Sequence, residues 1–80
     1  MGKIKKMTQA QRVLRFMQRH KKGITALQAI KHCGCIDLAG RIRDLKEDGH
    51  IIGSEYVYVV NQFGEKVRVK QYTLKEQLNG

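Results

Sequence analysis

The stretch LAGRIRDLKEDGHII, which spans Leu38–Ile52, decides the fold of this chain. Three of its apolar residues recur at helical spacing and fall on one stripe: Leu38, Ile42 and Leu45. Asp37 stands where a helix N-cap is needed, and Gly49 stands where a helix ends. β-branched residues follow at once. We therefore predict a helix from about residue 37 to residue 48 that leads directly into a strand.

Two shorter apolar patterns precede this helix, and each begins with a capping box of the form Thr-x-x-Gln. The first box, at residues 8–11, predicts a helix that ends near Gly23. Its buried face is expected to carry Ala10, Val13, Leu14 and Met17. The second box, at residues 25–28, predicts a short helix that stops at Gly34. We expect three apolar residues on its inward side: Ala26, Leu27 and Ile30.

The last third of the chain has the composition of a β-hairpin. IIGSEYVYVV (residues 51–60) and EKVRVKQYTL (residues 65–74) are rich in β-branched and aromatic residues. They flank a short loop in which Gly64 can adopt a positive φ. Because a lone hairpin is marginal in water, it must pack on the helices. The predicted fold is α+β, a three-helix bundle followed by a two-stranded hairpin. It forms one domain over residues 1–80, with a flexible basic arm at 1–6 and a short tail at 75–80.

The charge of the chain points to a polyanionic partner. The 80 residues carry a net charge of +9, and residues 1–24 hold eight lysines and arginines without any acid. Such a surplus on a small surface favours DNA, RNA, an anionic membrane or an acidic protein. A chain of this length has only a small core, which argues against an enzyme with a deep, dry pocket.

Neither a membrane segment nor a secretory signal is visible, since no apolar run approaches the roughly 20 residues that a membrane span needs. Cys33 and Cys35 are too close in sequence for an ordinary disulfide, and we interpret them as reduced thiols of a cytoplasmic protein. One of them is expected to fill a small core site. The motif HCGC (residues 32–35) lacks a second pair of ligands, so we predict no metal and no cofactor.

The third helix has features of a groove-reading element. Ala39 and Gly40 are small and let its N-terminal half approach another surface, and Arg41 or Arg43 could fork onto a guanine edge. The alternative is that these arginines are ordinary solvated surface on a core helix.

The chain resembles winged helix-turn-helix domains over about residues 7–74. The motif Arg41-Ile42-x-x-Leu45-x-x-x-Gly49-x-Ile51, followed by a hairpin, is similar to the junction between recognition helix and wing in many bacterial and archaeal regulators. MTQAQRVLRFM and GITALQAI resemble small helix-turn-helix proteins of bacteriophages and prophages. The resemblance implies that residues 37–43 face a DNA major groove and that residues 56–70 form the wing.

Other parts of the chain could hold the DNA backbone. Lys66, Arg68 and Lys70 alternate, so they project from one face of a strand and could contact phosphates, although edge-strand lysines also block aggregation. The basic arm could follow a minor groove, or it could be a solvated tail. Tyr58 and Phe63, near the tip of the hairpin, could stack on bases, or they could pack against each other and against a helix. The full set of candidate DNA-binding residues is Thr25, Gln28, Lys31, Asp37, Gly40, Arg41, Arg43, Lys66, Arg68, Lys70, Lys3, Lys5 and Lys6.

Two hypotheses for the function follow. In the first, the chain binds double-stranded DNA as a transcriptional regulator or architectural accessory factor of a phage or prophage. In the second, it is a phage-encoded module that inhibits or adapts a host protein through an acidic surface on that protein. The nearly neutral third helix favours the second hypothesis, because Asp44 and Glu47 would repel phosphates. Neither hypothesis involves catalysis, and the oligomeric state stays open.

Overall fold

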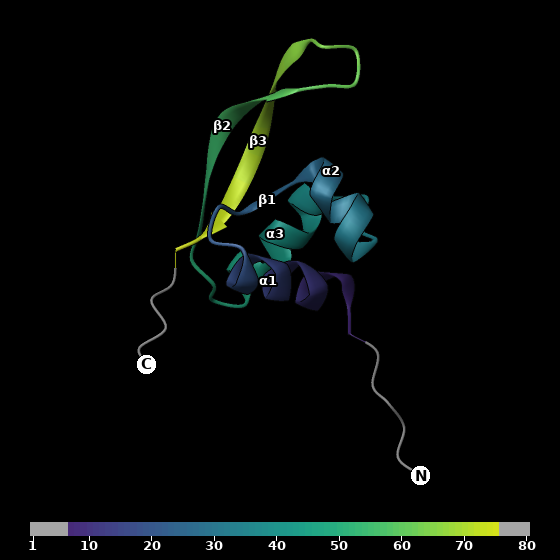
Figure 1. Cartoon of the computed structure of the whole chain (residues 1–80). Coiled ribbons are helices and arrows are strands. Elements are labelled where there is room, and N and C mark those ends of the chain that lie inside the picture. Colours follow the sequence, from purple (N-terminus) through teal and green to yellow (C-terminus); the bar gives the residue numbers. More distant parts are fainter. Residues whose placement is uncertain (1–6, 76–80) are drawn as a thin grey trace.

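The computed structural model describes residues 7–75 (Figure 1). Its elements follow in the order α1 (Gln9–Arg19), β1 (Ile24–Thr25), α2 (Ala26–Gln28), the π-helical turn η1 (Ala29–Cys33), α3 (Leu38–Glu47), β2 (Ile52–Val60) and β3 (Lys66–Leu74). The predicted α+β fold, with helices first and a hairpin last, is confirmed. The sheet differs from the prediction because it has a third strand, β1.

Local hydrogen bonds explain where the helices begin. Thr8 Oγ1 accepts from the backbone N–H of Gln11 at 3.1 Å, and Gln11 Oε1 accepts from the N–H of Thr8 at 2.8 Å. Thr25 and Gln28 make the same reciprocal pair at 3.4 and 3.0 Å. Both predicted capping boxes are therefore confirmed, and each satisfies two backbone donors that the helix leaves open.

The second helix turns a different side to the core than predicted. After α2 the backbone continues as the π-helical turn η1, which ends at Gly34 with φ +64°. The small residues Ala29 and Cys33 are buried, whereas Leu27 and Ile30 are 73% and 50% exposed. The predicted inward positions of Ala26, Leu27 and Ile30 are wrong, because this segment packs on the core through the small residues Ala29 and Cys33 of η1 instead.

The sheet has the strand order β1-β3-β2, and both pairings are antiparallel. Ile24 lies opposite Tyr72, and nine residue pairs join β2 to β3, from Ile52 opposite Leu74 to Val60 opposite Lys66. Gly23 precedes β1 with φ +102°, and a Cβ there would overlap the backbone of Tyr72. A glycine is thus required for β1 to approach β3.

The core lies between the helices and the base of the sheet. Its buried residues are Val13, Met17, Ile24, Ala29, Cys33, Cys35, Leu38, Ile42, Leu45 and Ile52. The predicted stripe of α3 is confirmed, and both cysteines occupy core positions. Tyr72 and Leu74 pack partly buried against this core, so the base of β3 is anchored to the helices.

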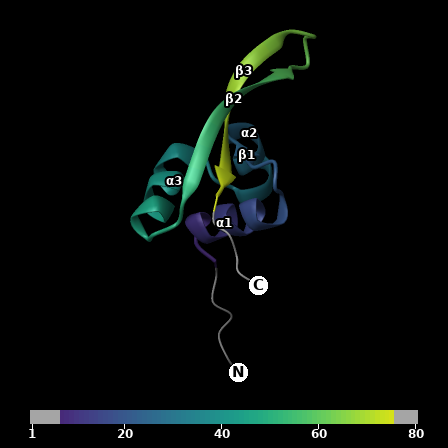
Figure 2. The ribbon, with the colours of Figure 1, turned by 90° about the vertical axis from the view of Figure 1, so that its left-hand side faces the viewer.

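The rest of the hairpin extends beyond the helices and arches over α2 (Figure 1). The perpendicular view in Figure 2 shows α3 on one side of the hairpin base and α2 on the other. Within residues 7–75, no helix is both long and apolar enough to cross a membrane.

Candidate nucleic-acid interface

The N-terminus of α3 is built around the Asp37 cap. Asp37 Oδ1 accepts from the backbone N–H of Gly40 at 3.1 Å. Gly40 is buried, and a Cβ at this position would overlap the Asp37 carboxylate. The prediction that Gly40 lets this half of the helix approach another surface is therefore wrong, because Gly40 is buried and leaves room for the Asp37 cap instead. Ala39 does lie on the exposed face.

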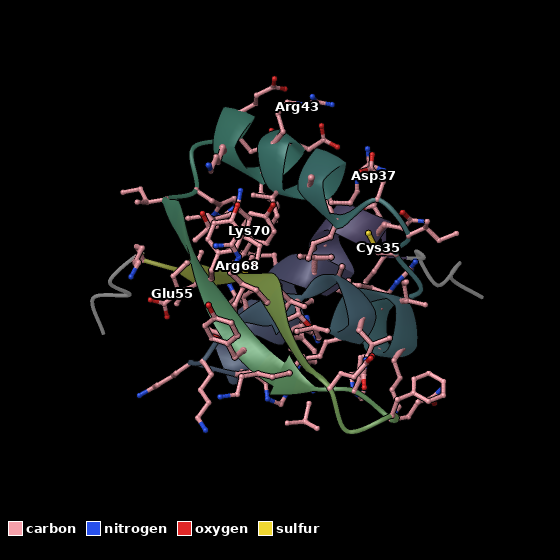
Figure 3. All side chains as sticks on the ribbon, turned by 90° about the horizontal axis from the view of Figure 1, so that it is seen from above. Cys35, Asp37, Arg43, Glu55, Arg68 and Lys70 are labelled. Carbon is pink, nitrogen blue, oxygen red and sulfur yellow. The ribbon has the colours of Figure 1, made fainter. Side chains whose placement is uncertain are left out.

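The two arginines of α3 differ in their environments. Arg41 Nε lies 3.0 Å from Asp44 Oδ2, with side chains 32% and 44% exposed, and this is the only ion pair between residues 7–75. Arg43 is exposed and projects from the outer side of α3, away from the hairpin (Figure 3). Of the two predicted base-reading arginines, Arg43 is thus free to meet a ligand, whereas Arg41 is partly neutralised by its own helix.

The second helical segment uses most of its predicted ligand groups internally. Thr25 is buried, and its hydroxyl and the Gln28 side chain serve the capping box. Lys31 remains as an exposed cation on η1. The contacts predicted from Thr25 and Gln28 to DNA stay predictions. The arm residues Lys3, Lys5 and Lys6 lie outside the described residues, so their predicted contacts stay predictions as well.

The wing carries a row of cations, which we call the basic row: Lys66, Arg68 and Lys70. All three side chains are exposed. They alternate along β3 in phase with Tyr72 and Leu74, which pack on the core. This face packs on the core only at the base of β3. Higher up, the side of the hairpin that faces the starts of α2 and α3 is lined mainly by valines of the opposite face, and of the basic row only Lys70 borders that space.

Tyrosine rings of β2 support the basic row. The Arg68 guanidinium carbon lies 4.5 Å from the centroid of the Tyr56 ring, and Lys70 Nζ lies 5.7 Å from the same centroid. Lys66 Nζ lies 5.9 Å from the Tyr58 centroid. These are cation–π distances, so the rings hold the cations in place without cancelling their charge. The sequence analysis did not predict these cation–π contacts, although the strand register places Tyr56 opposite Lys70 and Tyr58 opposite Arg68.

A groove of about 690 Å³ separates the hairpin from the starts of α2 and α3. Its walls are mostly apolar and include Leu27, Ile36, Ala39, Val57 and Val69, with Lys70 among the lining residues. The basic row and the exposed face of α3 are therefore two separate surfaces. The structure brings Lys70 beside the start of α3, but it does not bring Arg43 or Lys31 into the same groove.

The two cysteines lack the features of a reactive or metal-binding site. Burial is the main cause that raises the pKa of both thiols, and the nearby Cys35 raises that of Cys33 further. Raised pKa values keep thiols protonated and unreactive. Across residues 7–75, no three potential metal ligands come together.

Three helical segments around a small core, with the third leading into a twisted hairpin, define a helix-turn-helix with a wing. The family model described as "Winged helix-turn-helix domain" matches residues 8–77, and the chain belongs to this family. Membership of the family indicates nucleic-acid binding. No curated protein and no solved structure matches the chain.

Proposed function

We propose that the protein binds double-stranded DNA, with α3 in the major groove and the hairpin on the phosphate backbone. It would serve a bacteriophage or prophage as a transcriptional regulator or as an architectural accessory factor. The observation that carries this proposal is the basic row, three exposed cations that lie on tyrosine rings along one face of the wing. The family supports the same conclusion.

The separation of the two surfaces suits a duplex. A major groove is about 12 Å wide and is bordered by phosphates, so a helix inside it and a hairpin beside it touch different parts of the DNA. Arg43 can reach a base edge from the exposed side of α3, because none of the described residues forms an ion pair with it. The basic row then neutralises phosphates at the border of the groove.

Selection from a random duplex pool tests whether the protein reads sequence. We expect an enriched motif, and we expect Arg43→Ala to relax one base position by about 1–3 kcal/mol. Lys46→Ala is the matched control, because Lys46 is exposed on the same helix but near its C-terminal end. A pool without enrichment, or equal effects of the two substitutions, would contradict base reading by Arg43.

Two observations favour a second candidate, a phage-encoded module that inhibits or adapts a host protein with an acidic surface. The groove beside α3 is mostly apolar, and Asp44 pairs with Arg41. Apolar grooves are more typical of contacts with proteins than with phosphates. Absence of duplex binding at low salt, with a folded protein, would favour this candidate over DNA binding.

A further inference from the structure

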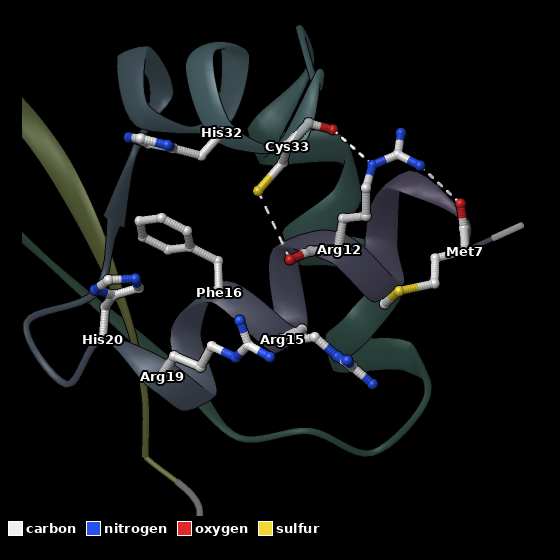
Figure 4. A pocket seen from close by; sticks show the side chains of 8 residues that line it. All are labelled: Met7, Arg12, Arg15, Phe16, Arg19, His20, His32 and Cys33. Carbon is white, nitrogen blue, oxygen red and sulfur yellow. Dashed lines mark hydrogen bonds between the residues drawn. The ribbon is translucent and has the colours of Figure 1, made fainter.

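A second cationic site lies between α1 and η1, apart from the wing. It is a pocket of about 260 Å³ that shares no lining residue with the groove or the basic row. We call it the Arg–His pocket, after its cationic and titratable side chains: Arg12, Arg15, Arg19, His20 and His32. Figure 4 shows these side chains around Phe16. The volume is slightly below the roughly 300–1,000 Å³ of pockets for drug-sized ligands, so it suits a small one.

The positive charge of this pocket is not compensated. None of the described residues that line it is acidic, and the first acid in the sequence is Asp37. The single ion pair within residues 7–75 lies elsewhere, on α3. The three guanidinium groups that line this pocket repel each other, so a bound anion would reduce the electrostatic repulsion between them.

The fold fixes one guanidinium at the pocket. Arg12 donates from Nε to the backbone carbonyl of Cys33 and from one terminal nitrogen to that of Met7, both at 2.8 Å (Figure 4). Both partners are neutral carbonyls, so the full charge of Arg12 remains. Its other terminal nitrogen makes no hydrogen bond to the described residues and stays available to a ligand.

Aromatic stacking fixes the two histidines. The ring centroid of Phe16 lies 4.1 Å from that of His20 and 5.5 Å from that of His32, both at an interplanar angle of 27°. Figure 4 shows Phe16 between the two imidazoles. Side chains from α1, from its C-cap residue His20 and from η1 therefore line the same pocket.

We propose that the Arg–His pocket binds a phosphate group, as a second anion site separate from α3 and the wing. A tetrahedral dianion can accept hydrogen bonds from several directions at once, and guanidinium groups bind phosphate through paired N–H donors. The phosphate belongs either to the backbone of a DNA duplex or to a free phosphorylated small molecule.

Titration with inorganic phosphate, followed by NMR, tests the site. We expect shifts at Arg15, Phe16 and His32 in the wild type, and binding weakened at least about ten-fold in the double variant R15Q/R19Q, because charge-assisted hydrogen bonds are lost. The matched control is K21Q/K22Q, which removes the same charge from exposed residues outside the pocket. It should bind phosphate within about two-fold of the wild type.

If phosphate binding is weakened equally in both variants, the proposal is overturned, because the net positive charge of the protein would then explain the binding without a specific site. The absence of any phosphate-dependent shift in the wild type would also overturn it. Thermal unfolding of both variants verifies that they fold. Arg12 is left unchanged because it also ties Cys33 to Met7.

A short duplex and adenosine monophosphate distinguish the two sources of the phosphate. If R15Q/R19Q weakens duplex binding more than K21Q/K22Q does, the pocket holds a phosphate of DNA. If only the mononucleotide loses affinity, the ligand is a small phosphorylated molecule. The titration with inorganic phosphate does not depend on DNA binding. If the protein binds no duplex, the proposed function is refuted, but the phosphate site is still tested by that titration.

Discussion

Release of Arg41 from its ion pair should strengthen DNA binding. Asp44→Asn removes the carboxylate that lies 3.0 Å from Arg41 Nε and frees one more cation on α3. Because one side chain of the pair is 32% and the other 44% exposed, solvent screens the interaction. We expect the free energy of unfolding to fall by at most about 0.5 kcal/mol, or roughly 2–4 °C in Tm.

The gain in binding can be worked out from counterion release. One added phosphate contact steepens the plot of log affinity against log salt by about 0.9. When the salt concentration is lowered from 200 to 50 mM, the affinity of Asp44→Asn for DNA should therefore rise about 3.5-fold more than that of the wild type. Fluorescence anisotropy with a labelled duplex over this salt range measures the slope.

Glu47→Gln is the matched control for Asp44→Asn. It removes the same charge from the exposed side of α3, but Glu47 takes no part in the Arg41 ion pair. We expect stronger binding of this control without a change of slope. An unchanged slope for Asp44→Asn, or weaker binding, would refute the reasoning and would mean that Asp44 holds Arg41 in a useful pose.

Three further predictions concern the fold. Gly23→Ala should destabilise the protein well beyond the roughly 1–2 kcal/mol expected for Gly49→Ala, measured by urea unfolding, because both have φ near +100° but only Gly23 abuts β3. Burial raises the pKa of the Cys33 and Cys35 thiols above the ordinary 9.0, so that, as the pH rises, the thiols of the unfolded chain lose their protons before those of the folded protein. The free energy of unfolding should therefore fall as the pH rises above 9. A free energy of unfolding that does not change with pH in this range would contradict the prediction. Leu27→Ala should change the free energy of unfolding by less than about 0.5 kcal/mol, whereas a core position for Leu27 would make the loss several-fold larger.

Features set by neighbours in sequence were predictable. The two capping boxes depend on residues three positions apart, and the stripe of α3 depends on helical spacing. The hairpin follows from two β-rich runs around a loop with Gly64, whose φ is +79° as expected. Each of these patterns lies within one continuous stretch of the chain.

Features set by distant partners were not predictable. β1 is only two residues long and exists because β3 lies beside it. The second helical segment buries the small residues Ala29 and Cys33 and exposes Leu27 and Ile30, and the apolar spacing gave no sign of this. The sequence predicts that Gly40 lets α3 approach another surface, whereas in the structure Gly40 is buried beside the Asp37 carboxylate.

The candidate site shows the same division. Alternation along β3 was enough to predict that Lys66, Arg68 and Lys70 share a face. The tyrosines beneath them require the register between two strands, and the Arg–His pocket requires α1 and η1 to meet. Charge counts alone could not separate these two cationic surfaces.

The salt dependence of duplex binding by a variant of the basic row tests the central claim most directly. If about six to eight cations contact phosphates, the wild type should show a slope of about −5 to −7, and K66Q/R68Q/K70Q should be flatter by about 2.7. The control K21Q/K22Q/K75Q removes the same charge from exposed lysines away from the basic row and should keep the wild-type slope. A slope near zero for the wild type, or equal slopes for the wild type and the K66Q/R68Q/K70Q variant, would contradict DNA binding through the wing.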